Sequence, residues 1–230
     1  LLQFLKEYGN AAAKAIYSKD DHKIYLAIRN LSDIKENPRA TSDDIRDAEI
    51  NLESCISSVK LISEAAYLAR LNWWTVEYGL VGEINNPKLF GAGLLSSVGE
   101  SYNVIFGDVK KIPFSLDCIN YSYDITEQQP QLFVAKDFNH LSGVLKELTE
   151  NMAFNKGGIS SIKKGIDSQS VCTFKLDSGV EISGLPTNFI GDEKEVFFNY
   201  LFQMDQILLI VFMILRRKKL ENFLQACIFL

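Results

Sequence analysis

One carboxylate in this chain lies where an unpaired charge would be costly. Glu77 falls within the octet WWTVEYGL, residues 73–80, and every other member of the octet is uncharged. Burying a carboxylate without a partner costs several kcal/mol, so Glu77 is expected to contact either a cation or a basic side chain. Arg70 lies about two helical turns earlier, on the same face of a helix. The residues alone leave two interpretations open, an ion pair with Arg70 and a metal ligand.

Other residue types that support catalysis are sparse or poorly placed. The chain has two histidines, His22 after a pair of aspartates and His140 at the start of a predicted helix, and both are expected to be surface residues. Neither is in a motif with a nucleophile, so no catalytic triad is predicted. The four cysteines form no C-x-x-C pair, which argues against a zinc knuckle or a dense disulfide framework.

A glycine-rich segment, GAGLLSSVGE, follows at residues 91–100. It lacks the third glycine of a dinucleotide fingerprint and the Lys-Ser/Thr ending of a P-loop, so no nucleotide site is predicted. Its glycines can equally serve a tight loop. The net charge of −5 argues against nucleic acid or an anionic membrane as a general partner.

The blocks WWTVEYGL and GAGLLSSVGE, at this spacing, resemble the core signature of the biopterin-dependent aromatic amino acid hydroxylases. The similarity runs from Leu1 to about Phe154 and includes NYSYDITEQQPQLFVAKDF at residues 120–138. It is greatest to a bacterial branch of phenylalanine 4-monooxygenases. The resemblance implies a monooxygenase that uses Fe(II), tetrahydropterin and O2 to hydroxylate an aromatic amino acid. Phenylalanine, giving tyrosine, is the expected substrate, and tyrosine and tryptophan stay open.

The same resemblance assigns roles to single residues. It places Trp73 beside the aromatic ring of the substrate, and Gly93 and Ser96 in the amino acid pocket, with the serine supplying a hydrogen bond. Ala69 falls where the family brings this helix against the pterin. Asn72 replaces a usual aromatic residue, which puts pterin binding in doubt. Tryptophans on an apolar helix are also common core residues, so core packing stays open for Trp73 and is favoured for its neighbour.

In that family a facial triad of two histidines and one glutamate holds the iron, and Glu77 matches the glutamate. The histidines belong to an H-E-x-x-G-H motif shortly before the region where this chain starts. The chain opens at Leu1 in what reads as the middle of a helix. It is therefore expected to be an incomplete piece, inactive by itself. An alternative from another class is a non-catalytic remnant that binds no iron.

Helical periodicity dominates residues 1–155, so a mainly α fold class is expected. The resemblance implies that these helices are the C-terminal part of the hydroxylase catalytic domain. Two helices are predicted over residues 1–34, with a break at 18–21. Thr41 with Asp44 makes a capping-box pattern for a third helix, and Ser63 is predicted to cap a fourth that runs to Leu80. Residues 131–135 form a short strand or connector, and residues 140–153 form another helix.

The pattern changes after residue 155. Residues 171–176 and 180–183 predict a hairpin that turns at Gly179, within a small, truncated β module at 156–195. Residues 196–230 form a hydrophobic tail that fits neither strand alternation nor a continuation of that module, so a non-native or frameshifted end is expected.

The tail raises the question of a membrane anchor. Its apolar core, residues 207–215, is shorter than the roughly 20 residues of a membrane-spanning helix, and Asp205 argues against insertion. A tail-anchored membrane protein is a less favoured alternative. Residues 1–8 lack the pattern of a secretory signal, and cytoplasmic localisation is expected.

Overall fold

The computed structural model describes residues 1–124, 127–176, 179–191, 195–204 and 207–216. The chain divides into two compact units. The first combines Leu1–Ala15 with Glu64–Asn155, and the second combines Ile16–Ser63 with the chain from Lys156 onward. Helical residues predominate among those described, as the sequence predicts. The predicted domain limits at residues 155 and 195 stay predictions.

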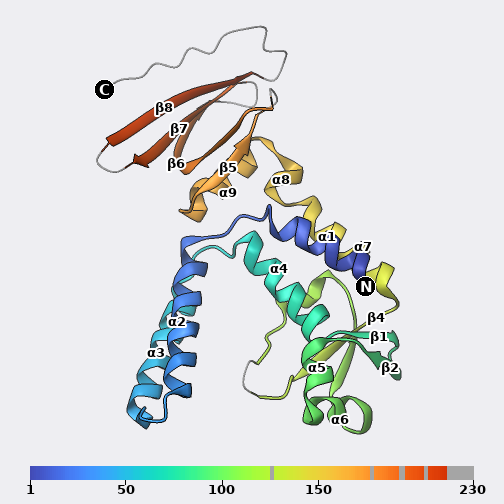
Figure 1. The fold of residues 1–230 in the computed structure, drawn as a ribbon. Helices are drawn as coiled ribbons and strands as arrows, with labels where there is room; N and C mark the ends of the chain where they lie inside the picture. Colours follow the sequence, from blue (N-terminus) through green and yellow to red (C-terminus); the bar gives the residue numbers. More distant parts are fainter. Residues whose placement is uncertain (125–126, 177–178, 192–194, 205–206, 217–230) are drawn as a thin grey trace. The chain divides into compact units, whose positions relative to one another are not determined.

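The first unit packs helices around a small mixed sheet, seen at the lower right of Figure 1. Its helical segments are α1 Leu2–Ala12, α4 Glu64–Asn72, the π-helix Trp73–Glu77, α5 Ala92–Ser96, α6 Val98–Phe106, the 3-10 helix Leu116–Asn120 and α7 Phe138–Glu150. Its strands are β1 Leu80–Glu83, β2 Asn86–Leu89, β3 Lys110–Pro113 and β4 Gln131–Ala135. The short helix α8, Ala153–Lys156, lies where the chain passes from one unit to the other.

The sheet has the order β2-β1-β4-β3, with β4 parallel to both of its neighbours and β1 antiparallel to β2. All five residues of β4 are buried and the last four are apolar, which fits a central strand with parallel neighbours. Leu132 and Phe133 of this strand join Leu71 and Trp74 in the main core. The two helices that pack together at the edge of the unit, α1 and α7, carry the buried apolar side chains expected of amphipathic helices.

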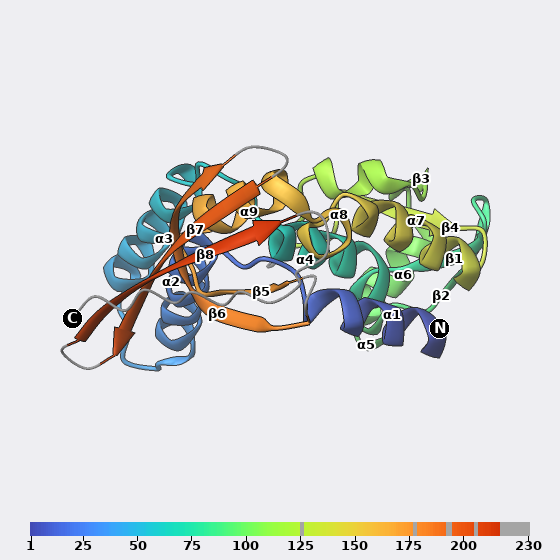
Figure 2. The same cartoon turned by 90° about the horizontal axis from the view of Figure 1, so that it is seen from above.

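In the second unit, α2 (Lys19–Glu36) and α3 (Ser42–Ser57) lie side by side as a helical hairpin (Figure 2). Both helices begin with a complete capping box, Ser18 with Asp21 and Thr41 with Asp44, in which each side chain accepts a hydrogen bond from the backbone N–H of the other residue. The box at Thr41 is the one that the sequence predicts. Each box satisfies N–H groups that have no partner inside the helix.

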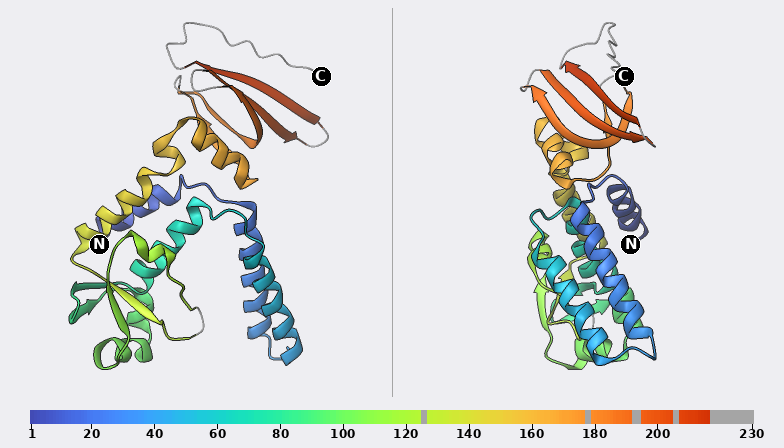
Figure 3. Two further views of the ribbon diagram at one scale, coloured as in Figure 1. Left: turned by 180° about the vertical axis from the view of Figure 1, so that it is seen from behind. Right: turned by 90° about the vertical axis from the view of Figure 1, so that its left-hand side faces the viewer.

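The C-terminal part of the second unit is a four-stranded antiparallel sheet packed with helix α9 (Gly158–Ser168), shown from two sides in Figure 3. The strand order is β5 (Cys172–Lys175), β6 (Glu181–Gly191), β7 (Glu195–Met204) and β8 (Ile207–Arg216). Ile162 of α9 is the centre of a small apolar cluster with side chains of β5 and β6. The predicted hairpin of β5 and β6 is confirmed by their antiparallel pairing.

The structure differs from the sequence expectation for the hydrophobic tail. Residues 195–204 and 207–216 are strands that extend the sheet of the β module, whereas the sequence pattern predicts no continuation of that module. Long runs of aliphatic and aromatic residues favour strands even without alternation of polar residues. Asp205 and residues 217–230, on which part of the tail prediction rested, lie outside the described residues. Among the described helices, none has the length and apolarity that a bilayer crossing requires.

Candidate functional site

The predicted metal ligand lies at the end of an unusual helical turn. Helix α4 passes at Asn72 into the π-helix Trp73–Glu77, where the N–H of Tyr78 donates to the carbonyl of Trp73, five residues back, at 2.9 Å. The buried hydroxyl of Thr75 donates to the carbonyl of Leu71 at 2.7 Å. Single π-turns are rare and are found frequently at functional sites. The helix was predicted to reach Leu80, but it ends at residue 77 and strand β1 follows.

The glycine loop packs directly on the backbone of this turn. A Cβ added to Gly91 would lie 2.4 Å from the carbonyl oxygen of Glu77, and one added to Gly93 would lie 3.0 Å from the same oxygen. The second Cβ would also lie 3.1 Å from Cζ of Tyr78. Glycine is required at position 91 because the two backbones approach so closely there, and position 93 has little room for a side chain. The structure thus brings Glu77 and Gly93, which the two sequence blocks carry separately, into one place.

The half-buried carboxylate of Glu77 has neither a hydrogen bond nor a salt bridge within the part of the chain that the structure describes. The alternative interpretation, an ion pair with Arg70, is wrong, since that guanidinium donates instead to the carbonyl of Ile119 at 3.1 Å. The described residues contain no group of three His, Cys, Asp or Glu side chains that could hold a metal ion.

The two histidines do not complete a metal site. Nδ1 of His140 accepts the backbone N–H of Lys136 at 3.2 Å, and its ring packs edge-on against Phe114. His22 is exposed in the second unit. The residues that the structure describes therefore do not by themselves fit Fe(II), which needs more than one protein ligand.

Trp73 is the centre of a small aromatic cluster. Its ring stacks on Tyr123 with centroids 4.5 Å apart and lies 5.0 Å from the ring of Tyr78. Its indole N–H donates to Oε1 of Gln129 at 3.0 Å. Trp74, in contrast, is 1% exposed and packs edge-on against Phe133, which confirms it as a core residue. Sequence reasoning did not find Tyr78, Tyr123 or Gln129.

Burial and two carboxylates raise the pKa of Tyr78, one of the two tyrosines in this cluster. Burial, followed by the charges of Glu100 and Glu77, raises the pKa of Tyr78 above its usual value. The phenol therefore stays protonated at neutral pH and can donate a hydrogen bond. Glu100 was not predicted as a site residue, because a single carboxylate at the start of a helix is a common sequence feature.

The two remaining predicted residues are exposed. The hydroxyl of Ser96, at the end of α5, donates to the carbonyl of Gly93 at 3.2 Å, which leaves its oxygen free to accept a further hydrogen bond. Ala69 is exposed on α4, one helical turn before Trp73.

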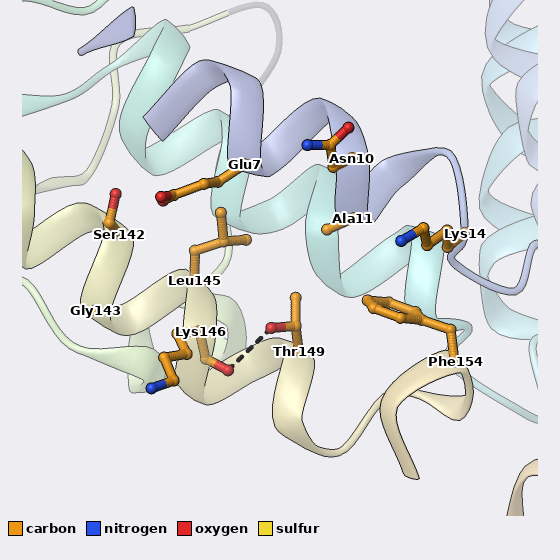
Figure 4. A pocket seen from close by; sticks show the side chains of 10 residues that line it. All are labelled: Glu7, Asn10, Ala11, Lys14, Ser142, Gly143, Leu145, Lys146, Thr149 and Phe154. Atoms are coloured by element: carbon orange, nitrogen blue, oxygen red, sulfur yellow. Dashed lines mark hydrogen bonds between the residues drawn. The ribbon is translucent and has the colours of Figure 1, made fainter. Parts of the chain in front are cut away.

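A cavity of about 450 Å³ lies elsewhere in the first unit, between α1 and α7 (Figure 4). Its lining combines both signs of charge with apolar side chains: Glu7, Asn10, Ala11, Lys14, Ser142, Gly143, Leu145, Lys146, Thr149 and Phe154. The ammonium of Lys14 lies 5.3 Å from the ring centroid of Phe154. A hydrogen bond from Ser142, then one from Gln3, lowers the pKa of Glu7. None of the predicted site residues lines this cavity.

The sequence pattern of the biopterin-dependent aromatic amino acid hydroxylases matches residues 23–156. The chain belongs to this family. The resemblance of the two sequence blocks to the family is thereby confirmed. Among its relatives is phenylalanine-4-hydroxylase of Vibrio cholerae, 40% identical over 80 residues, which are 34% of this chain and 28% of that protein.

The human phenylalanine-4-hydroxylase is 39% identical over 87 residues, covering 37% of this chain and 18% of the human protein. The chain thus spans less than a third of these curated relatives. A solved structure of phenylalanine hydroxylase from Chromobacterium violaceum, with iron and phenylalanine bound, is 27% identical. The match covers 47% of this chain and 45% of that one, with a TM-score of 0.33.

Proposed function

We propose that this chain is part of an iron- and tetrahydropterin-dependent monooxygenase that hydroxylates phenylalanine, and that Glu77 is one of the iron ligands. The observation that carries the proposal is the Glu77 carboxylate itself. It lies on a π-turn beside the glycine loop and has no cationic partner among the described residues. Two histidine ligands from outside this chain would complete the facial triad. Cytoplasmic localisation is part of the same proposal.

The side chains around Glu77 suit an aromatic amino acid. Trp73 would offer its indole ring to the substrate ring, since aromatic pairs gain energy beyond their buried area. Gly93 keeps the space beside Tyr78 open, because a side chain there would meet the phenol ring. The hydroxyl oxygen of Ser96 could accept an N–H of the substrate ammonium group. Ala69, one turn before Trp73, would leave room for the pterin.

A turnover assay tests this function. Tyrosine formation from phenylalanine is measured with Fe(II), tetrahydropterin and O2, in the protein that contains this chain together with the two histidines. Glu77→Ala is expected to abolish turnover. Glu83→Ala is the matched control, because Glu83 is an exposed carboxylate on the neighbouring strand β1. Unchanged turnover in Glu77→Ala would reject the assigned role.

A second candidate is a non-catalytic remnant that binds no iron. It is favoured by the lack of any three-ligand group among the described residues. Anaerobic Fe(II) titration of the 230-residue chain distinguishes the two candidates. Uptake of one Fe(II) per chain would reject the remnant, and no uptake by a longer protein that carries the histidines would reject the hydroxylase.

A further inference from the structure

Glu100 is a buried carboxylate that the proposed reaction does not use. It is 5% exposed and lies in the first turn of α6, whose N-cap Ser97 accepts the N–H of Glu100 at 3.3 Å. One oxygen, Oε1, accepts the backbone N–H of Gln129 at 3.0 Å. The other, Oε2, is buried and has no hydrogen-bond partner among the described residues. A half-satisfied carboxylate is a costly group to bury, so its single strong contact is expected to have a specific role.

Gln129, whose backbone N–H donates to Glu100, also has hydrogen-bond partners at both ends of its side-chain amide. Gln129 is 2% exposed, and its Oε1 accepts the indole N–H of Trp73 at 3.0 Å. Its amide nitrogen donates to the carbonyls of Asp124 and Glu127. If the amide were rotated by half a turn, its NH2 group would face the indole N–H of Trp73, and its oxygen would face the carbonyl oxygens of Asp124 and Glu127. The orientation of Gln129 is therefore determined by its partners.

These contacts form a continuous path from α6 to the aromatic cluster. Glu100 fixes the backbone of Gln129, and the amide of Gln129 fixes the nitrogen edge of the Trp73 ring. Tyr123 and Tyr78 contact the same ring. A tryptophan has two side-chain torsions, and a hydrogen bond at its nitrogen edge selects among the orientations that stacking alone would permit.

We propose that Glu100 and Gln129 are positioning residues that set the plane of Trp73 for the aromatic ring of the substrate. This inference rests on the proposed function for the contact between Trp73 and substrate, but the hydrogen-bonded path can be tested without it. Neither residue needs to touch the substrate. Their role is to keep one orientation of the indole ring populated before the amino acid binds, which lowers the free energy lost on binding.

The indole N–H resonances test the path directly. The chain has two tryptophans, so its 15N-labelled spectrum contains two indole signals, which Trp73→Phe assigns. Gln129→Leu removes the acceptor and is expected to move the Trp73 signal upfield and to speed its exchange with solvent. Glu100→Leu is expected to do the same, whereas Glu100→Gln keeps an acceptor oxygen for the Gln129 N–H and leaves the signal near its wild-type place.

One signal controls for unfolding, and one variant controls for non-specific effects. Trp74 is buried in the core with no hydrogen bond to its Nε1 in the described part of the chain, so its signal reports an intact core in each variant. Gln128→Leu removes an exposed neighbouring amide that pairs with Asn103 and not with Trp73. An unmoved Trp73 signal in Gln129→Leu, or an equal movement in Gln128→Leu, would overturn the inference. If Glu100→Leu fails to fold, Gln129→Leu decides.

Measurements with phenylalanine distinguish a failure of this inference from a failure of the proposed function. In the active enzyme, Gln129→Leu is expected to raise KM for phenylalanine about fivefold to tenfold, the effect of one lost hydrogen bond, and to change kcat much less. One informative result is that Gln129→Leu moves the Trp73 signal while added phenylalanine leaves the wild-type signal unmoved. That result would support the hydrogen bonds from Glu100 through Gln129 to Trp73 and would reject the contact between Trp73 and the substrate. A fall in kcat with unchanged KM in Gln129→Leu would overturn the positioning role.

Discussion

Replacing Gly91 with alanine tests whether the glycine loop must approach the Glu77 backbone as closely as the structure shows. Ordinary contact begins at about 3.4 Å, whereas the added Cβ would lie 2.4 Å from the Glu77 carbonyl oxygen, a shortfall of about 1 Å. The next two atoms, N of Gly79 and the carbonyl carbon of Glu77, also belong to the backbone, so no side chain can rotate away. Overpacking of this kind costs about 1 to 3 kcal/mol, and rigid neighbours place Gly91→Ala near 3 kcal/mol.

Urea denaturation followed by circular dichroism measures this cost. With the slopes typical of small proteins, a loss of about 3 kcal/mol lowers the urea midpoint by roughly 1 to 3 M. Gly143→Ala is the matched control, because Gly143 lies inside α7 and an added Cβ there meets nothing within 4 Å. That change is expected to stabilise the unit by about 0.5 to 1 kcal/mol. Equal midpoints for the two variants would refute the close approach.

Four further predictions each concern one side chain. Thr41→Ala, which removes a capping box, is expected to lower the free energy of unfolding by about 1 kcal/mol, and Thr41→Ser to restore it, as measured by urea denaturation. Hydrogen bonds from Thr41 lower the pKa of Asp44. The ionised Asp44 carboxylate therefore stabilises the fold above the unfolded-state pKa, and this stabilisation is lost as pH falls through the folded-state pKa. Asp44→Asn should reduce this loss of stability in acid, as measured by melting curves over a series of pH values. Burial raises the pKa of Cys118 to about 12, so a thiol reagent at pH 8 should modify Cys55 in the folded protein and Cys118 only after denaturation. In the protein that carries the two histidines, Arg70→Met should leave the Fe(II) affinity within about twofold of wild type. The reason is that the Arg70 guanidinium donates to the carbonyl of Ile119 and not to Glu77, the proposed ligand.

Local features of the fold were readable from the sequence where one residue type has one clear physical role. The capping pattern of Thr41 and Asp44 predicted the start of α3, and the apolar run at residues 131–135 predicted the strand β4. The turn before Val180 predicted the β5–β6 hairpin. The cap and the hairpin depend on contacts between residues close together in the sequence, so spacing was sufficient to predict them. The strand β4 was predicted from its apolar composition, although its pairing partners lie far away along the chain.

Features that depend on distant contacts were missed. The π-turn at Trp73–Glu77 inserts one residue into a helical pattern, which apolar periodicity cannot distinguish from an ordinary α-helix. The pairing of Trp73 with Gln129 joins residues 56 positions apart. Helical spacing put Arg70 on the face of Glu77, yet the long Arg70 side chain reached the carbonyl of Ile119. Spacing within an element restricts the possible partners of a side chain, and the tertiary fold selects among them.

The proposed hydroxylase function depends most on Glu77 as an iron ligand, and Fe(II) affinity tests this role most directly. Anaerobic titration calorimetry compares Glu77→Ala, Glu83→Ala and wild type in the protein that carries the two histidines. Loss of a direct ligand is expected to weaken Fe(II) binding by about a hundredfold or more, since even the loss of an outer partner costs 10- to 100-fold. Glu83→Ala should bind as wild type does. Equal affinity of all three proteins would contradict the assignment.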